Sequence, residues 1–174
     1  PVHLAHLRLR DFRNYARLDA GFSPGFHVLL GDNAQGKTNI LEAIYLMATL
    51  RSFRGVGGAQ MVKHSAKGYF VGGNVVGQGD HEIKMYWSSK ERKLALNGQP
   101  VKKLTDYFGT LRTVVFCTED LQLVKGTARS RRRFLDLLLA QVDLVLAPEL
   151  VGDGVGQHEV EVVAAEPGVA RRRQ

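Results

Sequence analysis

Hydrophobic and polar positions follow three patterns in the first fifty residues. Residues 4–18 roughly alternate apolar and polar side chains, which is typical of a half-buried strand. Residues 26–30 form a short apolar run after the turn signal Pro24-Gly25, and this run predicts a buried strand. Apolar residues within 37–50 recur at helical spacing and predict a helix whose Glu42 faces solvent. The chain therefore begins with two predicted strands and a helix.

Short segments rich in β-forming residues follow, separated by turn sequences. Gly77–Asp80 is one such turn, and Asn97-Gly98 is a strong signal for a two-residue hairpin. These features predict an antiparallel meander whose strands cover 69–76, 82–87, 92–96 and 99–101.

The pattern changes toward the C-terminal end. Residues 113–117 are another short apolar run and predict a buried strand. Residues 129–146 have the apolar spacing of a helix, which Thr127 or Ser130 could cap at its N-terminus. Beyond about residue 144 the composition narrows, and we expect no regular element there except a strand at 158–164.

The glycine-rich segment 31–38 carries the clearest chemistry. It has the phosphate-loop pattern G-x-x-x-x-G-K-[ST], and a strand is predicted before it and a helix after it. Its two glycines allow backbone amides to converge on phosphates, Lys37 reaches the β- and γ-phosphates, and the Thr38 hydroxyl binds Mg²⁺. A glycine-rich structural turn is the alternative reading. The predicted ligands of ATP or GTP are Gly31, Asp32, Asn33, Ala34, Gln35, Gly36, Lys37 and Thr38, with Thr38 also the predicted Mg²⁺ ligand.

Composition and charge narrow the class of protein. The 174 residues are 44% hydrophobic, about one domain in length, and contain no run approaching the roughly 18 apolar residues of a membrane helix. The sequence shows no secretory signal, and Cys117 is the single cysteine, so we expect a cytoplasmic protein. Residues 1–133 carry 21 Lys and Arg against 10 Asp and Glu, a net +11 within the total of +7. This excess of positive charge favours binding of nucleic acid. The alternative is that the charge only promotes solubility.

Other polar groups give weaker signals. Glu119 and Asp120 follow the predicted strand 113–117 and could hold a metal in a self-sufficient NTPase or kinase, or could simply belong to a polar loop. Residues 96–99 resemble an ABC signature but fit the hairpin better. His64, His81, His158 and Cys117 lack metal-ligand spacing. The last candidate is a basic cluster, either a solvated helix start or a phosphate-contacting patch, made of Lys125, Arg129, Arg131, Arg132 and Arg133.

Several motifs together resemble one known family. They are Leu7–Tyr15, Gly31–Tyr45, Ser52–Arg54, Glu119–Gly126 and Arg131–Asp136. In this combination the chain closely resembles the N-terminal part of RecF, a family of bacterial recombination and DNA-repair ATPases of the SMC/ABC type. The resemblance spans about residues 4–143, and Thr118 stands where the family usually has proline.

The resemblance implies a fold and a function. The fold is an α/β P-loop ATPase lobe of the ABC/SMC type, with a mixed core sheet, an antiparallel β-subdomain and the start of a helical arm. The function is ATP-dependent dimerisation, binding of single-stranded and gapped DNA, and weak DNA-stimulated ATP hydrolysis in DNA replication and repair, in recombination and in the SOS response to DNA damage. RecR and RecO are the implied protein partners in loading the recombinase. The resemblance also places Arg13 and Asn14 near the nucleotide and implies that the acidic pair 119–120 is not the Walker B carboxylate.

RecF proteins are about twice as long as this chain, and the resemblance predicts two segments. Residues 1–143 would form the ATP-binding lobe, and 144–174 an atypical tail, for which a frameshift is one hypothesis. The family's ABC signature and Walker B acids have no counterpart here, so we assign no catalytic residue and expect that the chain alone does not complete a catalytic site. A truncated, catalytically inert fragment is the alternative function.

Overall fold

The computed structural model describes residues 2–32, 35–77, 79–116 and 124–142. Its centre is a six-stranded antiparallel sheet with the strand order β2-β1-β3-β4-β5-β6. The strands are β1 (His3–Phe12), β2 (Tyr15–Gly21), β3 (Gly68–Val76), β4 (His81–Ser88), β5 (Arg92–Leu96) and β6 (Gln99–Pro100). The predicted meander is therefore confirmed.

The alternating segment 4–18 forms two strands, and the prediction of one strand is corrected. β1 and β2 form a hairpin in which Phe12 pairs with Tyr15, and Arg13 at its turn has a left-handed φ of 55°. Alternation continues through so short a turn, so the polarity pattern alone does not reveal the reversal. The turn brings residues 13 and 14 to the end of the sheet next to the phosphate loop.

The hairpin predicted at Asn97-Gly98 is confirmed. Both residues have positive φ, 51° and 77°, as a type I′ turn requires. Leu96 pairs with Gln99 across this turn. Because residues 96–99 join two strands, they cannot open a helix as an ABC signature does.

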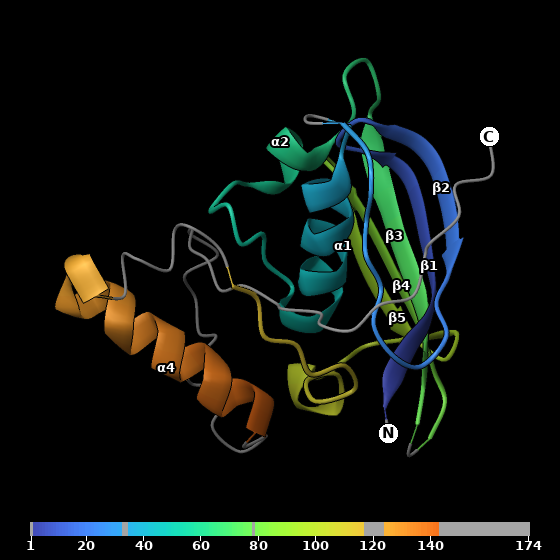
Figure 1. The fold of residues 1–174 in the computed structure, drawn as a ribbon. Coiled ribbons are helices and arrows are strands. Elements are labelled where there is room, and N and C mark those ends of the chain that lie inside the picture. The colour runs from blue at the N-terminus through green and yellow to red at the C-terminus, as the bar shows by residue number, and fades with distance from the viewer. Residues whose placement is uncertain (1, 33–34, 78, 117–123, 143–174) are drawn as a thin grey trace.

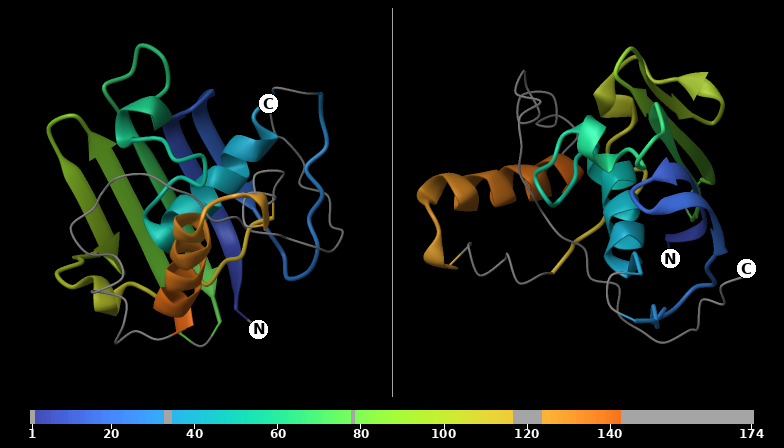
Figure 2. Two further views of the ribbon diagram at one scale, coloured as in Figure 1. Left: turned by 90° about the vertical axis from the view of Figure 1, so that its left-hand side faces the viewer. Right: turned by 90° about the horizontal axis from the view of Figure 1, so that it is seen from above.

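One face of the sheet is covered by the helix that follows the phosphate loop. This helix, α1 (Lys37–Thr49), lies along the sheet in Figures 1 and 2 and matches the helix predicted over 37–50. Between helix and sheet lies the main hydrophobic core, whose fully buried side chains include Leu7, Leu9, Val71, Ile83, Ala43 and Met47. Burial of these side chains fixes the position of α1, and with it the loop at its N-terminus.

The segments 26–30 and 113–117 were predicted to be buried strands, and the structure corrects this for their described residues. Each contributes an isolated bridge, at Val28 and at Val115, and Cys117 lies outside the described residues. Val28 is 45% exposed and Leu30 is 77% exposed. An apolar run predicts a buried strand only when other strands and a covering layer meet it, and the six-stranded sheet includes neither segment.

Smaller elements complete the described chain. They are α2 (Gly58–Met61), the 3₁₀ turn η1 (Leu104–Asp106) and α4 (Ala128–Val142). Figures 1 and 2 show α4 apart from the sheet, on the far side of α1. Phe134 of α4 packs against a second buried cluster, formed by Tyr45, Phe53 and Val115. The helix predicted over 129–146 is confirmed as far as residue 142, and the strand predicted at 158–164 lies outside the described residues.

Burial also affects two phenols in the core. It raises the pKa of Tyr69 above its usual value, and Arg92 partly opposes this effect. It likewise raises the pKa of Tyr107, whose hydroxyl donates to the carbonyl oxygen of Met47 in α1. The Tyr107 hydroxyl thus connects the segment after β6 with α1.

Candidate nucleotide-binding site

The phosphate loop runs directly into α1. Gly31 and Gly36 both have positive φ, 147° and 96°. The Nζ atom of Lys37 donates to the carbonyl oxygens of Gly31 and Asp32, each at 2.7 Å. The ammonium group therefore lies over the loop, where the motif requires a cation, while Asn33 and Ala34 lie outside the described residues.

Gly36 is fixed by a close neighbour as well as by its backbone angle. A Cβ atom at this position would lie 2.5 Å from the side-chain amide atoms of Asn14. Asn14 Nδ2 donates to the Gln35 carbonyl oxygen at 3.1 Å, and the Tyr15 hydroxyl donates to the Gly36 carbonyl oxygen at 3.2 Å. The β1–β2 turn thus packs against the loop from one side, and residue 36 must be glycine.

The N-terminus of α1 favours an anion. Its N-cap is Gly36, no side chain caps it, and its first turn contains no acidic residue. The first amides of a helix have no acceptor within the helix, and the helix dipole makes this end positive. The Thr38 side chain is exposed beside these amides. This end of α1 can therefore bind phosphate oxygens through its backbone amides. The Thr38 hydroxyl can bind a metal ion that accompanies the phosphates.

Glu42, predicted to face solvent, is fully buried, and the prediction is wrong. Its carboxylate accepts two bonds from Arg13, Nε to Oε2 at 2.8 Å and Nη2 to Oε1 at 2.6 Å. It accepts two more, from Arg54 Nη1 at 3.2 Å and from Ser52 Oγ at 2.5 Å. A buried carboxylate is tolerated when cations and donors satisfy it. These partners lie 10 to 29 residues away in sequence, so helical periodicity gives no sign of them.

A chain of hydrogen bonds connects the Glu42 cluster with the phosphate loop. Arg54 Nη1 also donates to Asn39 Oδ1 at 2.8 Å, and Asn39 Nδ2 donates to Asn14 Oδ1 at 2.8 Å. Asn14 in turn holds the Gln35 carbonyl oxygen. The sequence pattern does not predict these hydrogen bonds, although each of the residues that form them belongs to a motif that resembles RecF. We infer that the buried carboxylate sets the position of the loop through Arg54, Asn39 and Asn14.

The structure brings together most of the residues predicted to bind nucleotide. Gly31, Asp32, Gln35, Gly36, Lys37 and Thr38 lie at the N-terminus of α1, and Asn14 contacts them. Arg13 lies on the same turn as Asn14, but its guanidinium binds Glu42 and the Gln60 carbonyl oxygen, the latter at 2.9 Å. A direct contact between Arg13 and the nucleotide stays a prediction.

Comparison with known proteins agrees with this geometry. A family model described as an AAA domain matches residues 6–139. The chain belongs to the AAA-domain family.

The relatives of this AAA domain include RecF proteins. The DNA replication and repair protein RecF of Halalkalibacterium halodurans is 39% identical over 150 residues, which cover 86% of this chain and 40% of that protein. The predicted resemblance to the N-terminal part of RecF is thus confirmed. The chain spans about 40% of the length of the curated relatives that it matches.

Solved structures support the same fold. A recombination mediator protein RecF described with ATP has a TM-score of 0.77 and 30% identity, covering 82% of this chain and 39% of that one. The Smc head domain from Pyrococcus yayanosii has a TM-score of 0.62 at 19% identity, covering 78% and 32%, and shows the fold alone. The predicted fold class, an ATPase lobe of the ABC/SMC type, is confirmed.

The other candidate residues of the AAA domain, the acidic pair and the basic cluster, lie either outside the described residues or away from the phosphate loop. Glu119, Asp120 and Thr118 lie outside the described residues. In the basic cluster, Arg129 and Arg132 are exposed, and Arg131 Nη1 donates to the Gly126 carbonyl oxygen at 3.0 Å. Among the residues that the structure describes, no three His, Cys, Asp or Glu side chains gather to hold a metal ion. The same part of the chain contains no helix long and apolar enough to span a membrane.

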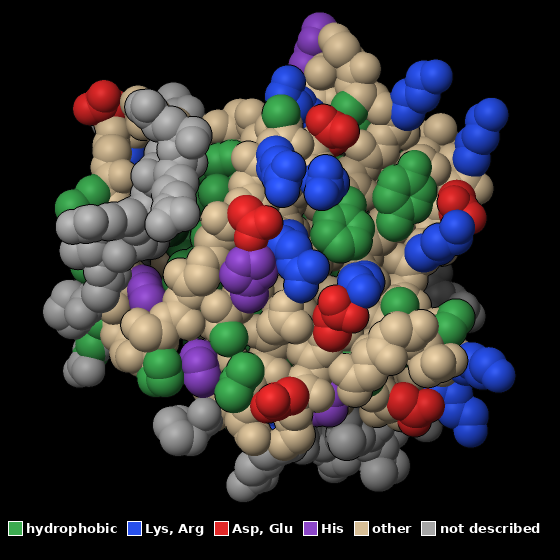
Figure 3. Space-filling view, turned by 90° about the vertical axis from the view of Figure 1, so that its right-hand side faces the viewer, with side chains coloured by type: hydrophobic (Ala, Val, Ile, Leu, Met, Phe, Trp, Pro, Cys, Tyr) green, Lys and Arg blue, Asp and Glu red, His purple; other side chains and the backbone are tan. Residues whose placement is uncertain are grey.

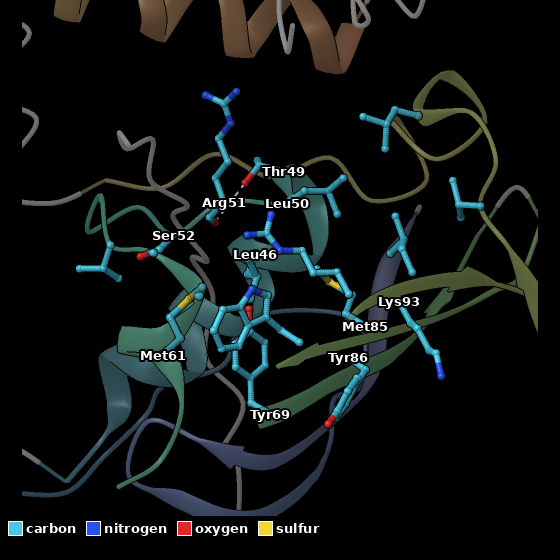
Figure 4. A pocket seen from close by; sticks show the side chains of 18 of the residues that line it. Leu46, Thr49, Leu50, Arg51, Ser52, Met61, Tyr69, Met85, Tyr86 and Lys93 are labelled. Atoms are coloured by element: carbon cyan, nitrogen blue, oxygen red, sulfur yellow. Dashed lines mark hydrogen bonds between the residues drawn. The ribbon is translucent and has the colours of Figure 1, made fainter. Parts of the chain in front are cut away.

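A cavity of about 600 Å³ lies at the other end of α1. Figure 4 shows Leu46, Met61, Tyr69 and Met85 around it, and Trp87 also lines it. The thirteen residues of α1 span about 20 Å, so this cavity is remote from Lys37. It therefore plays no part in the nucleotide site.

Proposed function

We propose that this chain is the ATP-binding lobe of a RecF-type DNA-repair protein. The observation that carries the proposal is the phosphate loop at an uncapped helix N-terminus, with Lys37 over the loop carbonyl groups of Gly31 and Asp32. The RecF structures described with ATP, to which the chain is similar, support it. We further propose that the lobe covers residues 1–143 and that 144–174, outside the described residues, is a separate tail.

Each residue of the site would bind a different part of the Mg²⁺–ATP complex or position the loop. Loop amides and the first amides of α1 would bind the phosphate oxygens of ATP, because they converge where the helix dipole is positive. Lys37 would exchange its two carbonyl acceptors for the β- and γ-phosphates. Thr38, whose side chain is exposed, would bind Mg²⁺ through its hydroxyl. Asn14 would keep the loop open by holding the Gln35 carbonyl oxygen.

Partners follow from the same proposal. A basic body of the kind seen in residues 1–133 attracts DNA through phosphate neutralisation. We propose that the protein acts in the cytoplasm, dimerises with ATP, binds single-stranded and gapped DNA, and works with RecR and RecO in recombinase loading and the SOS response. The similarity to a RecF described as part of the RecFOR pathway supports these partners.

Titration calorimetry with ATP and Mg²⁺ tests the proposal. We expect one ATP per chain, with weaker binding when EDTA removes the metal. Size-exclusion chromatography of the same samples should show a larger species with ATP than without it. An absence of heat at every ATP concentration up to the millimolar range would contradict the proposal, provided that circular dichroism shows a folded protein.

A further inference from the structure

The second face of the sheet is open to solvent. α1 covers one face, and Figure 3 shows the opposite face, where hydrophobic side chains lie among side chains of both charges, Lys and Arg as well as Asp and Glu. The pairing registers place five of these side chains in one row across the sheet, each opposite the next. In order from β2 to β5 they are Arg17, Arg10, Phe70, Tyr86 and Lys93.

Each aromatic side chain of this row lies close to a glycine of β3. A Cβ atom at Gly72 would lie 2.7 Å from the Cζ atom of Phe70. A Cβ atom at Gly68 would lie 3.1 Å from the hydroxyl oxygen of Tyr86. A side chain at residue 72 would displace the Phe70 ring, so the glycine lets this ring lie close to the backbone. Tyr86 is 38% exposed, so its ring is accessible.

The two cations at the β2 end of the row are arginines on neighbouring strands. Arg10 and Arg17 are exposed and stand directly opposite each other on β1 and β2. Like charges in such a cross-strand pair destabilise a sheet. Within the part of the chain that the structure describes, neither forms an ion pair. This contrasts with Lys84, which binds Glu82 at 2.7 Å, and with Lys93, which binds Glu91 at 2.8 Å. An external anion would relieve the repulsion between the two arginines.

We propose that this face binds single-stranded nucleic acid. Bases would stack on Phe70 and Tyr86, and phosphates would lie against Arg10 and Arg17 at the β2 end of the row. Five neighbouring strands span about 19 Å, so the row crosses the sheet as one continuous track. Aromatic rings beside a group of cations are the combination that binds single strands without sequence preference. Paired bases in a duplex cannot offer their faces to the rings, so an unpaired strand fits best.

This inference deepens the proposed function, since it rests on DNA as a partner and assigns that partner to one surface. Fluorescence anisotropy with labelled oligo-dT on the whole chain tests it. Stacking contributes about 1–3 kcal/mol per base, so Phe70→Ala and Tyr86→Ala should each weaken binding by about fivefold or more. Tyr86→Phe should bind like the wild type, and Tyr86→Leu, which keeps an apolar side chain, should lose affinity like the alanine variant.

Charge variants and matched controls separate the possible outcomes. Arg10→Gln and Arg17→Gln should each reduce the dependence of log affinity on log salt concentration by about 0.7. Arg112→Gln, which removes an exposed arginine in the segment after η1, should not change binding. If the ring variants, shown to be folded by circular dichroism, bind oligo-dT as the wild type does, the sheet face is not the site. The proposed function survives that result if Arg129→Gln or Arg132→Gln then loses affinity. If the wild type binds ATP but no oligo-dT at low salt, the sheet proposal and the DNA part of the function both fail.

Discussion

Replacing Glu42 by alanine is expected to lower the free energy of unfolding by about 3 kcal/mol. Removing one partner of a buried ion pair leaves the other charge uncompensated, which costs about 3–5 kcal/mol. The lower end applies here because the side chains of Arg13 and Arg54 are 17% and 34% exposed and can partly reach water. Ser52 also loses its acceptor. Urea titration followed by circular dichroism measures the effect.

Two variants make this result specific. Glu91→Ala removes a carboxylate that pairs with Lys93 at the surface, and exposed pairs of this kind contribute about 0–1 kcal/mol. Glu42→Gln keeps the shape of the side chain but removes its charge, so we expect a loss between those of Glu91→Ala and Glu42→Ala. If Glu42→Ala unfolds at the same urea concentration as Glu91→Ala, the buried cluster does not stabilise the lobe.

Replacing Lys37 by alanine is expected to weaken ATP binding about 10- to 100-fold without unfolding the protein. The ammonium group would donate to two phosphates, and hydrogen bonds to charged groups contribute about 1.5–3 kcal/mol. In the structure Lys37 bonds the Gly31 and Asp32 carbonyl oxygens. Both bonds are exposed, so water can replace the ammonium group, and we expect its loss to lower stability by only about 1 kcal/mol. Calorimetry gives the affinity, and a urea titration gives the stability.

Lys90→Ala is the matched control for Lys37→Ala. Lys90 is exposed in the turn between β4 and β5, so removing it changes the net charge equally without touching the loop. Equal losses of ATP affinity in both variants would mean that general charge, and not the position of Lys37, governs binding. If Lys37→Ala binds ATP with the affinity of the wild type, the phosphate loop is not the ATP-binding site.

Local patterns predicted much of the fold. The helix over 37–50 and the Asn97-Gly98 hairpin rest on neighbouring residues, and both are confirmed. The prediction of buried strands at 26–30 and 113–117 was wrong because a buried strand needs partner strands from distant parts of the chain. A run of apolar residues does not show whether such partners exist. The β1–β2 turn was missed because alternation passes through a short hairpin without interruption.

The candidate site was predictable to a similar degree. The loop pattern correctly brought Gly31, Gly36 and Lys37 together, since that motif is contiguous in sequence. Glu42 was assigned to the wrong side of α1, because periodicity treats any acid within an apolar helix as its solvent face. The ion pairs that bury it come from β1 and from the segment after α1. Their link to the loop through Asn39 and Asn14 exists only in the folded chain.

We propose that ATP binds at residues 31–38. Hydrogen–deuterium exchange of the wild-type chain, with and without ATP and Mg²⁺, tests this most directly because it reports on backbone amides segment by segment. We expect slower exchange in peptides covering the loop and the first turn of α1, and little change in the β4–β5 hairpin. Unchanged exchange at the loop, with protection around the cavity at the other end of α1, would contradict it.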